Sequence, residues 1–104
     1  MNIDFANLGM PVFTGRERGK NARNQFNLNS LDVQNVIVNL RIPDDVYSVT
    51  SSYFLGFFGD SVRALGREGF KSKYVFDAPK HISNKMDDWI TRALRDKSNV
   101  LRGV

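Results

Sequence analysis

Residues 51–66 read Ser51-Ser52-Tyr53-Phe54-Leu55-Gly56-Phe57-Phe58-Gly59-Asp60-Ser61-Val62-Arg63-Ala64-Leu65-Gly66, and this stretch decides the fold. Phe54, Phe58 and Val62 are four residues apart, so they share one face of a helix. Ser51 or Ser52 would make a good N-cap, because a serine hydroxyl can accept a hydrogen bond from a free amide of the first turn. The pattern predicts an amphipathic helix that packs its phenylalanine face on a core.

Three glycines mark this predicted helix. Gly66 is expected to end it, since glycine readily adopts the left-handed conformation that follows many helices. Gly56 and Gly59 lie inside it, where each costs about 1 kcal/mol relative to alanine. The close approach of another backbone would explain glycines at these two positions.

Shorter patterns on both sides of this helix predict the remaining elements. Residues 34–40 contain a β-branched run that is apolar on both faces, which predicts a central strand covered on both sides. The other expected elements are strands over residues 2–6, 12–13 and 70–76, a short helix over 19–28, and an amphipathic helix from Ser83 to about Asp96. Strands separated by helices favour parallel pairing. We therefore expect an α/β fold, a small layered domain with a mixed, mostly parallel sheet and about three helices.

Length and composition limit the class of protein. A chain of 104 residues with 41% hydrophobic and 25% charged residues suits one folded domain over residues 1–104, with a frayed tail expected at 98–104. The chain contains no cysteine and one histidine, His81. This composition excludes disulfides, thiolate metal sites and a multi-histidine zinc site. We therefore expect no metal and no cofactor.

The N-terminal segment and the apolar runs bear on location. The first ten residues carry no basic side chain, so they do not have the pattern of a signal peptide. No apolar run approaches the roughly 20 residues needed to span a bilayer. We expect a cytoplasmic protein with no membrane partner.

Groups that carry catalysis are scarce in this sequence. A nucleophile–base pair would need His81, whose neighbours Pro79 and Ile82 suggest a surface or capping position. Asp44-Asp45 comes without a third oxygen ligand for a metal. No glycine-rich phosphate loop or dinucleotide fingerprint occurs. The sequence therefore predicts a protein that is not an enzyme.

Hydroxyl side chains gather at the start of the predicted helix, in Ser48-Val49-Thr50-Ser51-Ser52. Free amides and the positive end of the helix dipole favour an anion there. A phosphoryl group on Ser52 or Ser51 would add about −1.5 to −2 charge at pH 7. Two interpretations stay open at this point: a phosphorylation switch, or residues that only cap the helix.

The same helix suggests a surface for a protein partner. If the phenylalanine face meets the sheet, Tyr53 and Asp60 point away from it and Phe57 lies on the flank. Together with Thr50 they form a candidate partner-binding patch, because exposed aromatic side chains are common at docking surfaces. In the alternative, the first helix or the N-terminal segment of the chain covers Phe57.

The segment from Thr50 to Arg63 resembles the signature of the small bacterial STAS-like proteins. In that family a strand leads into a serine pair, an aromatic residue, and then a phenylalanine–glycine. Residues 19–26 and 89–94 resemble the first and the last helix of the family. The chain departs from the family at Leu55 and Gly56, where acidic residues are common.

The resemblance implies a STAS-like fold and a regulatory function. In the related anti-sigma-factor antagonists, a partner kinase of the histidine-kinase-like ATPase class phosphorylates the serine at the start of this helix. Ser52, or Ser51 next to it, occupies that place here, and Thr50 stands where those antagonists usually have an aspartate. The resemblance therefore implies a non-enzymatic protein-binding module with such an ATPase as its partner.

The charge distribution supports a second hypothesis. The net charge is +4, and basic residues outnumber acidic ones ten to five over residues 61–104. Such charges suit a solvated helix face, but phosphate contacts would give a nucleic-acid-binding domain. The candidate residues are Arg63, Arg67, Lys71, Lys73, Arg92 and Arg95, with Lys97 and Arg102 further along the chain. A third possibility is a phage or mobile-element accessory protein that blocks a host factor by surface contact.

Overall fold

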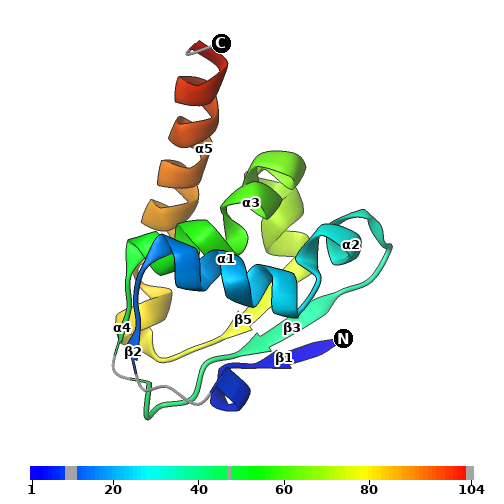
Figure 1. The fold of residues 1–104 in the computed structure, drawn as a ribbon. Coiled ribbons are helices and arrows are strands. Elements are labelled where there is room, and N and C mark those ends of the chain that lie inside the picture. Colours follow the sequence, from blue (N-terminus) through cyan, green and yellow to red (C-terminus); the bar gives the residue numbers. More distant parts are fainter. Residues whose placement is uncertain (9–11, 47, 103–104) are drawn as a thin grey trace.

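Strands and helices alternate along the chain in the predicted order (Figure 1). The computed structural model describes residues 1–8, 12–46 and 48–102, except for the side chains of Val12 and of residues 97–102. The elements are β1 (Asn2–Asp4), the 3-10 helix η1 (Phe5–Leu8), β2 (Val12–Phe13), α1 (Arg16–Gln25), α2 (Leu28–Val33), β3 (Val38–Arg41), β4 (Ser48–Val49), α3 (Ser51–Lys73), β5 (Tyr74–Asp77), α4 (Lys80–Ser83) and α5 (Met86–Arg102). The predicted α/β domain with a parallel sheet is confirmed.

The sheet contains three parallel strands in the order β1-β3-β5. Its register places Ile3, Leu40 and Phe76 side by side. β3 is central, as the apolar run in residues 34–40 predicted, although the strand begins only at Val38. A second parallel pair joins β2 to β4, and β4 was too short to give a sequence pattern.

Only one face of this sheet is covered, so the expectation of a strand covered on both sides is wrong. Val38 and Leu40 are buried, whereas Asn39 and Arg41 between and after them are exposed. Ile37, just before the strand, is 54% exposed. Helices α1, α2 and α3 lie over one face in Figure 1, and the opposite face is open. The domain therefore has two layers.

α3 is longer than predicted because it resumes after a break. Gly66 does interrupt it, with φ +77° and ψ 170°, a conformation available at low cost only to glycine. The chain then continues as helix to Lys73, so the predicted strand over residues 70–76 begins only at Tyr74. Phe70 is buried in this last helical segment, where its ring lies 6.3 Å from that of Phe54.

The other boundaries differ from the predictions by a few residues. β1 ends at Asp4, α1 runs over residues 16–25 and not 19–28, and α5 begins at Met86. The tail expected to be frayed over 98–104 is helical up to Arg102, and residues 103–104 lie outside the described chain. The short helices α2 and α4 were not predicted.

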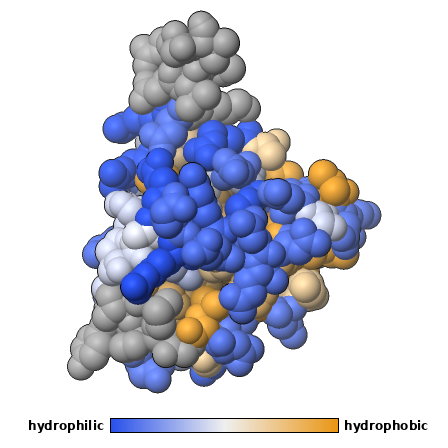
Figure 2. Space-filling view, in the orientation of Figure 1, coloured by the Kyte–Doolittle hydropathy of each residue, from blue (hydrophilic) through white to orange (hydrophobic). Residues whose placement is uncertain are grey.

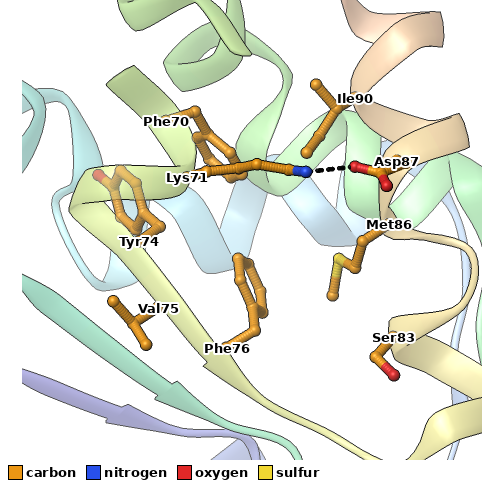
Figure 3. Close-up of a pocket in the computed structure, with 9 residues that line it drawn as sticks. All are labelled: Phe70, Lys71, Tyr74, Val75, Phe76, Ser83, Met86, Asp87 and Ile90. Atoms are coloured by element: carbon orange, nitrogen blue, oxygen red, sulfur yellow. Dashed lines mark ion pairs between the residues drawn. The ribbon is translucent and has the colours of Figure 1, made fainter. Parts of the chain in front are cut away.

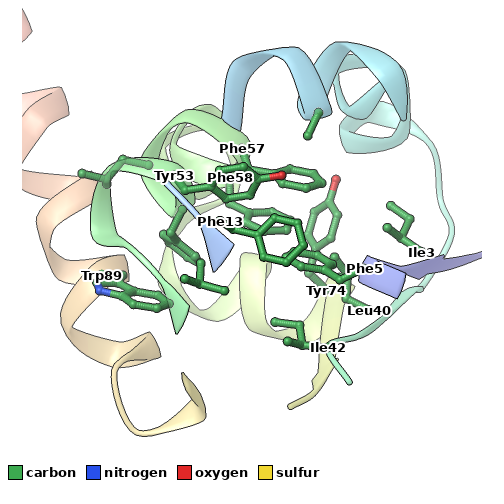
Figure 4. Close-up of a cluster of buried hydrophobic side chains, with 14 of the residues drawn as sticks. Ile3, Phe5, Phe13, Leu40, Ile42, Tyr53, Phe57, Phe58, Tyr74 and Trp89 are labelled. Atoms are coloured by element: carbon green, nitrogen blue, oxygen red, sulfur yellow. The ribbon is translucent and has the colours of Figure 1, made fainter. Parts of the chain in front are cut away.

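The core is largely aromatic (Figure 4). Phe5 packs against Phe13 and Phe57, with ring centroids 5.0 and 5.7 Å apart. On the other side of α3, Phe54 lies 5.1 Å from Trp89 of α5. By contrast, Figure 2 shows a mostly hydrophilic surface where α1 faces the viewer. These contacts make α3 the central helix of the domain.

α1 crosses α3 at two glycines. A Cβ atom on Gly19 would lie 2.2 Å from the carbonyl oxygen of Tyr53, and one on Gly56 would lie 2.2 Å from that of Arg16. Real Cβ atoms do not approach backbone so closely, so both positions require glycine. The close approach that would explain Gly56 is therefore confirmed, whereas a Cβ on Gly59 would meet only the side chain of Arg63.

Candidate functional site

Two short parallel strands each pass into a helix at one edge of the domain. Phe13 of β2 lies opposite Val49 of β4, and the amide of Thr50 extends this pairing by donating to the carbonyl oxygen of Phe13 (2.9 Å). α1 follows β2 and α3 follows β4, so the first turns of both helices lie at the same edge (Figure 1). Two positive helix-dipole ends therefore lie near each other.

Thr50 is the N-cap of α3, one residue before the predicted serine caps. Its backbone is extended (φ −82°, ψ 157°), and its Oγ1 accepts a hydrogen bond from the amide of Tyr53 (3.2 Å). Ser51 and Ser52 are thus the first two residues of the helix. The prediction of a serine N-cap is wrong, because the threonine hydroxyl already holds that position.

The two candidate phosphoacceptors differ in exposure. Ser52 is exposed, whereas Ser51 and Thr50 are half-buried. Neither serine hydroxyl bonds to another residue in the part of the chain that the structure describes. All three residues remain at the junction of a strand and a helix, outside the core.

Tyr53 and Phe57 do not form an exposed patch, so this part of the partner-binding prediction is wrong. Tyr53 is 1% exposed and Phe57 is 0% exposed. The reason is that α1 lies directly on α3 at the two glycines. In addition, Phe5 packs against both aromatic rings and Phe13 packs against Tyr53. The alternative, in which the first helix or the N-terminal segment covers Phe57, is confirmed. Burial also raises the pKa of Tyr53 to about 12.

Asp60 is exposed, as predicted, but it is engaged within the chain. Its carboxylate lies 2.5 Å from the guanidinium of Arg63 and 4.0 Å from that of Arg23. The hydrogen bond from Arg63 is the main cause that lowers the pKa of Asp60. Asp60 is ten residues from Thr50, which is about 15 Å along a helix. The two residues therefore do not form one compact patch.

Most of the candidate nucleic-acid residues bind other parts of the same chain. Arg63 contacts the carbonyl oxygen of Ala93, and Arg67 donates to Thr91 (2.5 Å). Arg67 and Lys71 both pair with Asp87 of α5. Lys73 binds the backbone carbonyls of Gln34 and Val36. Arg92 and Arg95 are exposed on α5, and the side chains of Lys97 and Arg102 lie outside the described residues.

A buried polar network that the sequence analysis missed joins α1, α2, α3 and β5. Arg23, 5% exposed, donates to the Asp32 carboxylate (2.8 Å) and to the Oγ of Ser61 (2.7 Å). Asp32 also accepts from Ser61 (2.8 Å) and from the hydroxyl of Tyr74 (2.5 Å). Asn29 accepts two further hydrogen bonds from the Arg23 guanidinium.

This network stabilises the packing of four elements. Ser61 is 0% exposed, so a substrate could reach it only if a helix moved away. Burial, followed by the hydrogen bond to Asp32, raises the pKa of Tyr74, which keeps its hydroxyl protonated as a donor. No spacing in the sequence connects residues 23, 32, 61 and 74, because the fold alone brings them together.

His81 lies on the surface, as predicted. Its ring is on α4 and is exposed, and its Nε2 lies 3.3 Å from the carbonyl oxygen of Val46. This contact ties α4 to the loop that precedes β4.

Comparison with protein-family models, with curated proteins and with solved structures found no match to this chain. Across the described residues, every helix is too short or too polar to cross a bilayer.

Proposed function

We propose that this chain is a regulatory protein-binding module of STAS-like type, and that the first turn of α3 is both its docking point and its phosphorylation site. Ser52 is the preferred acceptor, and Ser51 is the second. The partner is a kinase of the histidine-kinase-like ATPase class, and the phosphorylation takes place in the cytoplasm. The module itself catalyses no reaction.

The observation that supports this proposal is that Thr50 and Ser52 have different roles at the start of α3. Thr50 makes the cap through its hydroxyl, and the hydroxyl of Ser52 is left exposed on the second residue of the helix. A kinase could therefore reach Ser52 without unfolding the cap. Addition of a phosphoryl group there would leave the hydrogen bond between Thr50 and Tyr53 in place.

The surroundings of Ser52 favour the phosphorylated form. A phosphate would carry about −1.5 to −2 charge at pH 7, next to the free amides and the positive dipole end of α3. The first turn of α1 lies at the same edge and carries two exposed arginines, Arg18 and Arg16, of which Arg16 pairs with Asp96 at 3.8 Å. Phosphorylation would thus change the charge of this edge without disturbing the core.

The test is incubation of the protein with ATP and a kinase of this class, followed by mass spectrometry of the peptides. We expect phosphate on Ser52 or Ser51, and Ser52→Ala should lower the yield at least fivefold. Ser72→Ala is the matched control, since Ser72 is an exposed serine near the opposite end of α3. Phosphate found only at other residues would contradict the proposal.

A further inference from the structure

β5 presents a free edge on the side of the domain where α5 begins. The sheet order is β1-β3-β5, so β5 pairs with a strand on one side only among the described residues. The amide of Ile42 donates to the carbonyl oxygen of Asp77 (2.8 Å), so Asp77 directs its backbone toward β3. Successive residues of a paired strand direct their backbone groups to opposite sides, so those of Phe76 point outward. An edge of this kind pairs readily with another extended chain.

An apolar groove of about 310 Å³ adjoins this edge. Figure 3 shows the ring of Phe76 rising from β5 into the groove, with Met86 opposite it at the start of α5. Phe70 and Ile90 close the upper side. Phe76 and Met86 are both only half-buried, so apolar surface remains open to solvent in the groove.

The groove is bounded on two sides. Ser83 of α4 and Met86 of α5 lie across from Phe76 and form a second wall beyond the edge of β5 (Figure 3). A second copy of the domain would have to bring a whole sheet and its helices past this wall. A single extended peptide can lie between β5 and the wall, as in other complexes where a peptide adds a strand to a sheet edge.

The rim of the groove carries an excess of positive charge. Asp87 Oδ1 lies 2.5 Å from Nζ of Lys71 and 3.6 Å from Nη1 of Arg67, so two cations share one carboxylate. Asp87 is ionised at neutral pH like any exposed aspartate, and the hydrogen bond from Lys71 is the main cause that lowers its pKa further. One positive charge remains at the rim for an acidic group of a ligand.

We propose that an extended peptide, with an apolar residue two positions from an acidic one, binds in this groove as an added strand on β5. Its backbone pairs with Phe76, and its apolar side chain enters between Phe76 and Met86. Its acidic side chain contacts Arg67 and Lys71. This site shares no lining residue with the proposed phosphorylation site at the start of α3, so the two proposals can fail separately.

The first test is selection of a displayed library of random linear peptides against the full chain, followed by measurement of Kd for a selected synthetic peptide. We expect the selected peptides to share an apolar residue two positions from Glu or Asp. Met86→Lys should weaken binding at least tenfold, while its melting temperature shows that the domain is folded. Val33→Lys is the control, because Val33 is 85% exposed on α2 and should leave Kd unchanged. Ser52→Glu should also leave it unchanged.

A second test leaves the protein intact and changes the peptide backbone. N-methylation of the peptide amide that faces β5 should abolish binding, whereas methylation of the next amide should not. The proposal is overturned if no peptide is enriched, if Met86→Lys binds as well as the parent, or if both methylated peptides bind equally. A dimer of the chain that Met86→Lys dissociates would also overturn it, since a second copy would then occupy the edge.

Discussion

The two sides of α3 are packed in opposite ways. Toward α1, the backbones touch at Gly19 and Gly56, and a charged pair is sealed between the elements. Toward α5, large side chains such as Phe54 and Trp89 separate the helices, and the groove beside β5 opens nearby. The size of the residues at a helix contact therefore decides whether any space is left beside it. The α1 side is built for stability, and the α5 side has room for a ligand.

The largest expected effect is on the sealed side, at Asp32. Asp32→Ala would leave the guanidinium of Arg23 buried without its carboxylate, so we expect a loss of about 3–5 kcal/mol in the free energy of unfolding. Urea unfolding of the variant and the parent measures this loss.

Replacing both charged residues separates the contribution of the ion pair to stability from that of side-chain packing. Arg23→Met with Asp32→Leu removes both charges, so it should be less destabilising than Asp32→Ala alone. If the double variant is the less stable of the two, the network is stabilised by more than the pairing of its charges.

Gly56→Ala tests the contact between the helices. Its Cβ would lie 2.2 Å from the carbonyl oxygen of Arg16, so α1 must move away, at a cost of about 1–3 kcal/mol. The control is Gly59→Ala, whose Cβ meets only the guanidinium of Arg63 (3.2 Å). We expect Gly59→Ala to be neutral or stabilising, because alanine favours the helix. Equal losses in the free energy of unfolding of the two variants would show that the backbones of α1 and α3 do not touch at Gly56.

Alkaline pH tests the burial of Tyr53. Its pKa is raised from about 10 to about 12, so the unfolded chain ionises first as the pH rises. The stability is therefore fully present below pH 10 and decreases between pH 10 and 12, by about 1 kcal/mol at pH 11 from this residue. Urea unfolding at pH 8 and 11 should show a smaller decrease for Tyr53→Phe. An identical decrease would place the tyrosine hydroxyl in water.

The smallest effects are expected at the start of α3. Thr50→Ala removes the cap and should cost about 1 kcal/mol. Ser52→Ala should change the free energy of unfolding by less than about 0.5 kcal/mol, because an exposed hydroxyl that caps nothing contributes little. Thermal unfolding of both variants gives the comparison. A larger loss for Ser52→Ala would assign the cap to the serine.

The order of the elements could be predicted because each long helix or strand has its own periodic spacing of apolar residues in the sequence. The run in residues 34–40 identified the central strand, and the spacing of Phe54, Phe58 and Val62 identified α3. A glycine inside a helix correctly signalled the contact at Gly56. β4 has two residues and α4 has four, which is too short for any period to appear.

The site was harder to predict, because burial depends on how many layers cover a helix. Helical spacing assigns one buried face, and on that basis Tyr53 and Phe57 would be exposed. α3 is instead covered from two sides, so both residues are in the core. The pairing of Arg23 with Asp32 depends on contacts between elements, which no local pattern contains.

The break at Gly66 also affects the dynamics of α3, because it divides the helix into two segments. A helix leaves its first amides without a carbonyl acceptor, and the break at Gly66 creates a second such start within a helix that looks continuous in outline. We expect hydrogen–deuterium exchange at residues 67–69 to be faster than in the turns before and after them. The two segments of α3 would then open as separate cooperative units.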